Sequence, residues 1–279
     1  MSEFEQYLAT CLDDVTPSRV KDAMQYSLMA KGKRVRPNIL FATLEAYGLH
    51  KELGYACASA IEMIHTYSLI HDDLPAMDDD TLRRGMPTCH VQFDEATAIL
   101  AGDALLTQAF IEASKTSDNA NINQKVIAYL AKYAGADGMI LGQIRDILGE
   151  HKQLSLEELQ QIHIYKTGKL LTLPFICSAI ISQHEEDIEQ WIKIGIYLGL
   201  SFQIQDDILD ETSTVEELGK NIHSDIRNEK TTYVTLLGID GAKQEAKRYY
   251  EEAIALLKTM HLHTKPIEDY MYSLIQRKK

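Results

Sequence analysis

Two long stretches of this sequence are apolar on nearly every face that a helix would present. One is "ACASAIEMIHTYSLIHDD", residues 56–73, and the other is "WIKIGIYLGLSFQIQDDILD", residues 191–210. A helix that is apolar all round belongs in the interior of a protein. Each stretch ends in a cluster of aspartates, so the sequence predicts two central helices that carry carboxylates at one end of a cavity.

The rest of the chain also has a helical pattern. Apolar residues recur at intervals of three and four, for example between residues 156 and 165, and the alternation typical of strands is almost absent. Ser155 and Glu158 have the spacing of a capping box, and Thr16 followed by Pro17 is typical of a helix start. We therefore predict an all-α bundle.

No Gly/Ser-rich linker or low-complexity tract divides the chain, so we expect one domain over residues 1–279. The most apolar run, residues 170–182, contains Pro174 and is shorter than the roughly 18 to 20 residues that a membrane span needs. This run predicts a buried helix and no stable membrane insertion. The acidic N-terminal segment lacks the order of a signal peptide, so export is not expected.

Charge and cysteine usage limit the class of protein further. The chain has 28 basic and 41 acidic residues, a formal net charge of -13, which disfavours nucleic-acid binding. Cys11, Cys57, Cys89 and Cys177 lie far apart in the sequence and suggest reduced thiols in a cytoplasmic protein, not a disulfide framework or a zinc site. An anionic substrate would need a local group of basic side chains or bound cations.

The two acidic clusters predict a metal site. They contain Asp72, Asp73 and Asp78, and Asp206, Asp207 and Asp210. The second set is spaced to share one helical face, whereas Pro75 disrupts the first helix, so that Asp78 returns through a bulge. Carboxylates without nearby His or Cys suit magnesium that bridges to phosphate oxygens. An EF-hand is excluded because Arg83 stands where its loop needs glycine. The alternative, a solvated acidic helix end, is disfavoured because there are two such clusters.

Basic residues that could bind phosphate stand in short motifs, several of them beside these clusters, at Lys33, Arg34, Arg36, Arg83, Arg84, Lys166, Lys220 and Lys230. Arginine binds phosphate through two parallel hydrogen bonds, and lysine acts as a point charge. Each of these residues taken alone is more often a solvated surface charge, but their position favours phosphate binding. There is no G-x-x-x-x-G-K-[ST] loop, so P-loop chemistry is not indicated.

Several motifs stand in a fixed order along most of the chain: "GKRVRP", "HTYSLIHDDLPAMDDDTLRRG", "AILAGDALL", "GMILGQIRDI", "KTG", "FQIQDDILD", "LGK", "KTTY" and a terminal "QRKK". Together they closely resemble the trans-isoprenyl diphosphate synthase family, and within it the bacterial farnesyl diphosphate synthases. "DDLPAMD" is similar to the family's first Asp-rich motif with two extra residues. His223 departs from the pattern, because the family usually has glycine there.

The resemblance implies an isoprenoid synthase fold, with about ten or more helices around a deep central cavity, and usually a homodimer. It implies a prenyltransferase that condenses isopentenyl diphosphate with dimethylallyl or geranyl diphosphate. Magnesium-assisted ionisation, condensation and elimination would release diphosphate and give (2E,6E)-farnesyl diphosphate.

The resemblance also implies roles for individual residues. The six aspartates would hold three magnesium ions on the allylic diphosphate. Further contacts to that substrate would come from Arg83, Lys166, Thr167, Gln203, Lys220 and Lys230. Isopentenyl diphosphate would bind Lys33, Arg36, His65 and Arg84. The residues expected to matter most for catalysis are Asp72, Asp73, Asp78, Arg83, Lys166, Asp206 and Lys220. His65 and His71 could each be core histidines, an interpretation that we favour for His71 only.

Product length follows from Tyr67, which stands five residues before Asp72 and so about 7.5 Å back along a helix. In the resembled family a bulky residue near this place forms a floor and favours the fifteen-carbon product. Tyr67 could instead simply fill the core, and a geranylgeranyl diphosphate synthase stays an alternative. A non-catalytic subunit of a heteromeric synthase and a class I terpene cyclase are also alternatives, although the cyclase would lack "GKRVRP" and "DDILD".

Overall fold

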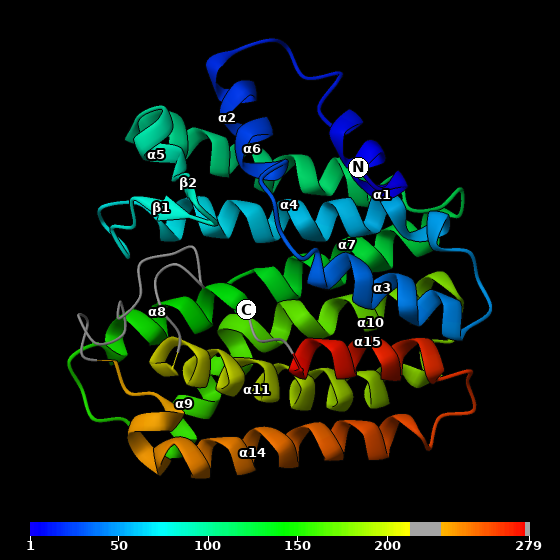
Figure 1. Cartoon of the computed structure of the whole chain (residues 1–279). Coiled ribbons are helices and arrows are strands. Elements are labelled where there is room, and N and C mark those ends of the chain that lie inside the picture. The colour runs from blue at the N-terminus through cyan, green and yellow to red at the C-terminus, as the bar shows by residue number, and fades with distance from the viewer. Residues whose placement is uncertain (213–229, 277–279) are drawn as a thin grey trace.

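The structure, a computed structural model, describes residues 1–212 and 230–276 and is almost entirely helical (Figure 1). The α-helices are α1 (Glu3–Thr10), α2 (Arg19–Leu28), α3 (Val35–Ala46), α4 (Tyr55–Asp72), α5 (Cys89–Gln92), α6 (Glu95–Ala113), α7 (Ala120–Ala134), α8 (Met139–Gly149), α9 (Leu156–His163), α10 (Lys169–Ile181), α11 (Ile188–Thr212), α14 (Tyr233–Leu257) and α15 (Lys265–Ile275). Short helical turns are η1 (Lys51–Gly54), η2 (Ile164–Gly168) and η3 (Glu185–Asp187), and a hairpin pairs β1 (Leu82–Arg83) with β2 (Met86–Pro87). The prediction of an all-α fold with ten or more helices is confirmed.

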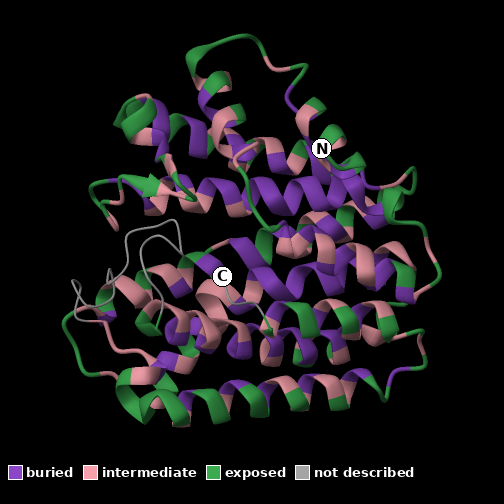
Figure 2. Ribbon diagram, viewed as in Figure 1, coloured by how far each residue is buried: buried purple, intermediate pink, exposed green. Residues whose placement is uncertain are grey.

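The two stretches that are apolar on every face form α4 and α11, and α10 packs between them. Figure 2 shows that α4 and α10 are buried along most of their length. The C-terminal ends of α4 and α11, which carry the two acidic clusters, lie on the same side of the bundle (Figure 1). This arrangement confirms the predicted central helices and the buried helix predicted over residues 170–182.

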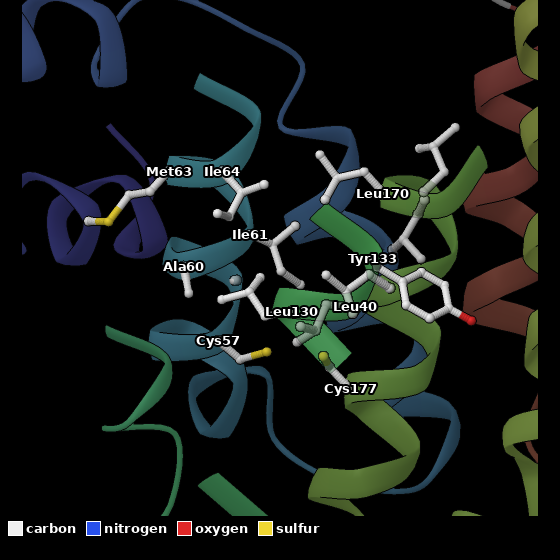
Figure 3. Close-up of a cluster of buried hydrophobic side chains, with 14 of the residues drawn as sticks. Leu40, Cys57, Ala60, Ile61, Met63, Ile64, Leu130, Tyr133, Leu170 and Cys177 are labelled. Carbon is white, nitrogen blue, oxygen red and sulfur yellow. The ribbon is translucent and has the colours of Figure 1, made fainter. Parts of the chain in front are cut away.

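The larger core lies where α3, α4, α7 and α10 meet. Leu40, Ile61, Leu130 and Leu170 converge there, each almost fully buried (Figure 3). The four cysteines are free and buried, and those on α4 and α10 point toward one another in the same close-up. A second, smaller apolar cluster joins α9, α11 and α14. The expectation of one domain over residues 1–279 stays a prediction.

The helix starts show which local signals the chain uses. The capping box is confirmed, because the Ser155 hydroxyl accepts from the Glu158 N–H and the Glu158 carboxylate accepts from the Ser155 N–H. The start predicted at Thr16 and Pro17 is wrong by two residues. Helix α2 begins at Arg19, because Ser18 is extended and its hydroxyl accepts the N–H of Lys21 at 3.1 Å.

Two glycines allow η2, a single π-helical turn, to lie unusually close to its neighbours. A Cβ atom at Gly142 of α8 would collide with the backbone of Lys166, and one at Gly199 of α11 would lie 2.8 Å from the Cα atom of Gly168. Only glycine permits backbones to approach this closely. The turn that carries the "KTG" motif is therefore held between α8 and α11 by backbone contact.

Two helical stretches in the described part of the chain are long and apolar enough to cross a membrane by length and composition, Glu95–Ala113 and Leu156–Ile181. The second is 72% buried inside the protein, as expected of a core helix. The first, helix α6, is only 44% buried and leaves much apolar surface uncovered.

Candidate active site

A cavity of about 450 Å³ lies between α4 and α8. It is lined by Arg36, His65, Tyr67, Ser68, Leu69, His71, Asp72, Met77, Met139, Ile140, Gln143, Ile144, Ile147, Lys166 and Thr167. The lining combines a few charged groups with apolar side chains, most of which come from α8. A cavity of this kind can bind a molecule with a charged head and an apolar tail.

The first acidic cluster surrounds the end of α4. Asp72 is the last residue of the helix, and the N–H of Asp78 donates to the carbonyl oxygen of Asp72 at 2.9 Å. The chain therefore turns back after Pro75, as predicted, and brings Asp78 beside the helix end. The pKa of Asp72 is raised to about 6, chiefly by burial and also by the nearby carboxylate of Asp78, against the opposing charge of Lys166. Burial therefore outweighs the positive charge near Asp72.

Asp73 has a different environment from Asp72. Its buried carboxylate accepts from Nε of Arg83 at 2.7 Å and from Nη2 of the same guanidinium at 2.5 Å. Burial raises the pKa of Asp73, although the bonds from Arg83 act in the opposite direction. The pair ties hairpin β1–β2 to the end of α4, so that both expected site residues are engaged with each other.

The second acidic cluster lies on the last turns of α11. Asp206 and Asp210 are half-buried, whereas Asp207 is buried and accepts the backbone N–H of Tyr233 at 2.9 Å. Tyr233 is the first residue of α14, and Lys230 stands three residues before it. The Lys230 ammonium lies 3.7 Å from the carboxylate of Asp78. Lys230 and the first residue of α14 thus contact one acidic cluster each.

Lys230 and Lys166 share a carboxylate that sequence reasoning missed. Oδ2 of Asp146, on α8, lies 2.6 Å from Nζ of Lys166 and 3.1 Å from Nζ of Lys230. Glu150, the residue that follows the last residue of α8, lies 3.3 Å from Lys230. Burial favours the neutral acid, but the two ammonium groups outweigh it and lower the pKa of Asp146 to about 2.

A second group of basic side chains comes from the N-terminal half of the chain. Arg36 and His65 line the cavity, and Arg84 is close enough to affect the charge of both. Burial lowers the pKa of Arg36 to about 10, and burial followed by the charges of Arg36 and Arg84 holds the pKa of His65 well below its usual value. His65 is therefore neutral beside two cations. Lys33, which belongs to the "GKRVRP" motif together with Arg36, is exposed.

Arg34 does not belong to this group. Its buried guanidinium pairs with Glu62 at 2.7 Å and donates to the carbonyl oxygens of Leu28 and Ala30. The interpretation of Arg34 as a phosphate contact is replaced by a structural one, in which it fixes the "GKRVRP" loop onto α4. This anchoring matters for the site because Arg36 follows two residues later.

The remaining expected residues fall into three groups. Thr167 donates to Oε1 of Gln203 at 2.9 Å, so the two lie together, on η2 and α11. Tyr67 is buried and packs its ring against His71, whose Nε2 lies 3.1 Å from the carbonyl oxygen of Ile99. His71 therefore has a protein partner, but it is half-buried and lines the cavity, so it does not lie in the core as we predicted. Lys220 and His223 lie outside the described residues.

Residues 17–267 match the family described as polyprenyl synthetase. The chain belongs to this family. The farnesyl diphosphate synthase of Micrococcus luteus is 48% identical to it over 259 residues, covering 92% of this chain and 88% of the relative. The farnesyl diphosphate synthase of Haemophilus influenzae is 51% identical over 252 residues, covering 87% of this chain and 84% of the relative. The geranylgeranyl diphosphate synthase of Cyanophora paradoxa is 44% identical over 241 residues, covering 85% and 80%.

A solved structure gives the same result for the fold. The crystal structure of geranyltransferase from Helicobacter pylori, complexed with magnesium and isoprenyl diphosphate, is 35% identical in sequence and has a TM-score of 0.86. The alignment covers 98% of this chain and 92% of that chain. This polyprenyl synthetase is therefore a prenyltransferase with the isoprenoid synthase fold.

The carboxylates of this polyprenyl synthetase fit magnesium. Asp72 and Asp78 present carboxylate oxygens at the end of α4, the donor type that magnesium prefers. In residues 1–212 and 230–276, no three acidic, His or Cys side chains converge tightly enough to hold an ion by themselves. Ions bound here would need oxygens from another source, and a substrate diphosphate supplies them.

Asp146 and Glu150 are the site residues that sequence reasoning missed. They stand in "GMILGQIRDILGE", which includes one of the motifs that the chain shares with the resembled family. Its acids are four residues apart and do not form a cluster, so they did not suggest a site. One signal was present, because Gly142 precedes Asp146 by four residues and so shares its helix face. A glycine beside an acid on one face of an apolar helix indicates a close approach to another segment.

Proposed function

We propose that this prenyltransferase condenses isopentenyl diphosphate with dimethylallyl or geranyl diphosphate and releases diphosphate and (2E,6E)-farnesyl diphosphate. The observation that carries the proposal is the cavity of about 450 Å³, which is lined by Asp72 and Lys166 at the end of α4 and by apolar side chains along α8. Asp146, Asp78 and Lys230 lie beside this charged end, in ion pairs that include Lys166. The farnesyl diphosphate synthases at 48% and 51% identity support the same product.

The allylic diphosphate would bind between the two acidic clusters. The six aspartates of the two clusters would hold magnesium, three ions being expected. Asp73 also accepts from Arg83, and Asp207 also accepts the backbone N–H of Tyr233. When bound, magnesium supplies positive charge that stabilises the departing diphosphate. The protein adds further charge near this place, from Lys166 and Lys230, and Thr167, Gln203, Arg83 and Lys220 are the other proposed contacts.

Isopentenyl diphosphate would bind at Lys33, Arg36, His65 and Arg84. Arg36 and Arg84 supply fixed positive charge, and neutral His65 can donate one hydrogen bond without adding to their mutual repulsion. The apolar walls of α4 and α8 would exclude water from the allylic cation. The departing diphosphate, held beside Lys166, is the proposed acceptor of the proton that is lost.

Tyr67 is the proposed limit on product length. It is 6% exposed, lines the cavity one turn further from Asp72 than His71, and packs edge-on against the His71 ring. An aromatic floor at this place would stop a growing chain at fifteen carbons. Geranylgeranyl diphosphate stays the alternative product, because synthases of that product are also relatives.

The protein is proposed to be a homodimer that pairs through α6. This helix is apolar enough to span a membrane but only 44% buried, and it exposes Ile99, Leu100 and Ile111. A second copy of the chain would cover this apolar surface. Light scattering should give a molar mass twice that of one chain. Leu100→Glu should lower this mass to that of one chain. Leu53→Glu, at an equally exposed site on η1, should stay dimeric; a monomeric wild type would refute the pairing.

The test of the function is incubation of the purified protein with magnesium, labelled isopentenyl diphosphate and either allylic diphosphate, followed by chromatography of the products. A fifteen-carbon diphosphate supports the proposal. A twenty-carbon product favours the geranylgeranyl synthase, and no product without an added partner chain favours a subunit of a heteromeric synthase. The cytoplasmic location stays a prediction.

A further inference from the structure

We propose that Asp146 is a positioning residue, whose carboxylate holds the ammonium groups of Lys166 and Lys230 side by side to receive the allylic diphosphate. The inference rests on the proposed function and extends it to a residue outside the two acidic clusters. Asp146 comes from α8, Lys166 from η2, and Lys230 from the segment before α14. One side chain therefore joins three separate parts of the chain.

The geometry explains why a shared oxygen is needed. Both ammonium groups contact the same atom, Oδ2 of Asp146, at 2.6 and 3.1 Å, and both lysines are mostly buried. Two cations held this close repel one another strongly in a partly buried site. A diphosphate carries several negative charges and can bind both cations at once. Asp146 holds the pair together before that substrate arrives.

The other acids around the two lysines cannot replace this contact. Glu150 and Asp78 contact Lys230 only, and Asp72 acts on Lys166 through its charge without a bond in the described structure. Without Asp146, Lys230 would be drawn to Glu150 and Asp78, and Lys166 toward Asp72. The lysines would then separate and occupy two carboxylates that are proposed to hold magnesium.

Neighbouring groups fix Asp146 itself. Gly142, one turn earlier on α8, packs directly on the backbone of Lys166, so the helix face that carries Asp146 cannot move away from η2. Thr231, next to Lys230, donates to the carbonyl oxygen of Lys152 at 2.9 Å and accepts the N–H of Leu154. The backbone segments that carry the carboxylate and both lysines are thus held in place, and Asp146 sets the positions of the two ammonium groups.

The test compares Asp146→Asn with the matched variant Glu150→Gln. Both variants remove one negative charge near Lys230, from α8 or from the residue that follows it, but only the first removes the contact shared with Lys166. Calorimetry with inorganic diphosphate and magnesium, together with steady-state kinetics, measures the result. Asp146→Asn should weaken diphosphate binding and raise KM for the allylic substrate about 10-fold or more, because a charge-assisted bond is lost at each lysine. Glu150→Gln should have a clearly smaller effect.

Two further readouts separate positioning from a general structural effect. KM for isopentenyl diphosphate should change much less than KM for the allylic substrate, and Asp146→Glu should restore part of the lost affinity. Circular dichroism and thermal unfolding check that each variant is folded. If Asp146→Asn and Glu150→Gln behave alike, or if both KM values rise together, the inference is wrong. A wild type that binds diphosphate but forms no product would refute the proposed function instead.

Discussion

The buried carboxylate of Asp207 accepts the backbone N–H of Tyr233, the first residue of α14, at 2.9 Å. Its neighbour Asp206 is half-buried at the same end of α11. Two adjacent aspartates of one motif therefore have separate tasks, one in the attachment of α14 and the other in the proposed magnesium site. The difference can be measured.

Asp207→Ala should lower the free energy of unfolding by about 1–3 kcal/mol, because it leaves the buried N–H of Tyr233 without an acceptor. Asp206→Ala is the matched control and should destabilise the protein less, because Asp206 is half-buried whereas Asp207 is buried, although it should form no product. Urea denaturation followed by circular dichroism measures the first effect, and product chromatography the second. Equal destabilisation by the two variants would contradict the division of tasks.

Tyr67→Ala should lengthen the product from fifteen to twenty carbons, because it removes a ring that lines the cavity and lies against His71. Tyr67→Phe is the control. The Tyr67 hydroxyl is buried and has no hydrogen-bond partner among the described residues, so its removal should leave the fifteen-carbon product unchanged. Chromatography of the hydrolysed products distinguishes the two lengths. A fifteen-carbon product from Tyr67→Ala would show that this ring only fills the core.

Stability should fall in mild acid partly through His163. Burial lowers the pKa of this histidine from 6.5 to about 4, so the unfolded chain binds a proton at a higher pH than the native protein does. The unfolding free energy that neutral His163 contributes is fully present above pH 6.5 and is lost as the pH falls toward 4. His163→Phe keeps a ring against Tyr233 and should reduce the loss of unfolding free energy between pH 7 and pH 5 by about 2 kcal/mol. Urea titrations at the two pH values test this, and an unchanged pH dependence would refute it.

Tyr47 provides the hydrogen-bond acceptor for the indole N–H of a fully buried tryptophan. Its hydroxyl accepts from Nε1 of Trp191 at 2.7 Å and donates to the carboxylate of Asp187, also at 2.7 Å. Tyr47→Phe should cost about 1–3 kcal/mol of unfolding free energy, because the indole N–H loses its acceptor inside the protein. Asp187→Ala should cost less, since the tyrosine hydroxyl stays in place for Trp191. Thermal unfolding compares the two, and the opposite order would be evidence against this explanation.

Much of the fold followed from the sequence because its strongest signals are local. The apolar stretches, the capping box at Ser155 and the turn at Pro75 each depend on residues within a few positions of one another, and all three are confirmed. The helix start predicted at Thr16 and Pro17 was wrong because two local signals compete there. Ser18 offers a competing cap two residues later, and the choice between adjacent caps depends on backbone geometry that composition does not fix.

The site was harder to predict than the fold, because residue type does not give orientation. Adjacent helical residues point about 100° apart, so consecutive acids in "DDILD" face different neighbours. Arg34 and Arg36 diverge in the same way, one toward Glu62 and the other toward the cavity. Asp146 was missed because both of its partners are remote in sequence, 20 and 84 residues away. A contact of this kind becomes visible only when three segments are placed together.

The glycines that face η2 limit which dimensions of the cavity can change through substitutions. Side-chain walls adjust by changing rotamers, but at Gly142 and Gly199 the neighbours of η2 are in backbone contact, and no rotamer change can alter their spacing. The charged end of the cavity is therefore a fixed dimension of the protein, whereas the opposite end is bounded by side chains such as Met139 and Tyr67. Variants that accept longer or shorter tails can arise at the apolar end without disturbing recognition of the head group.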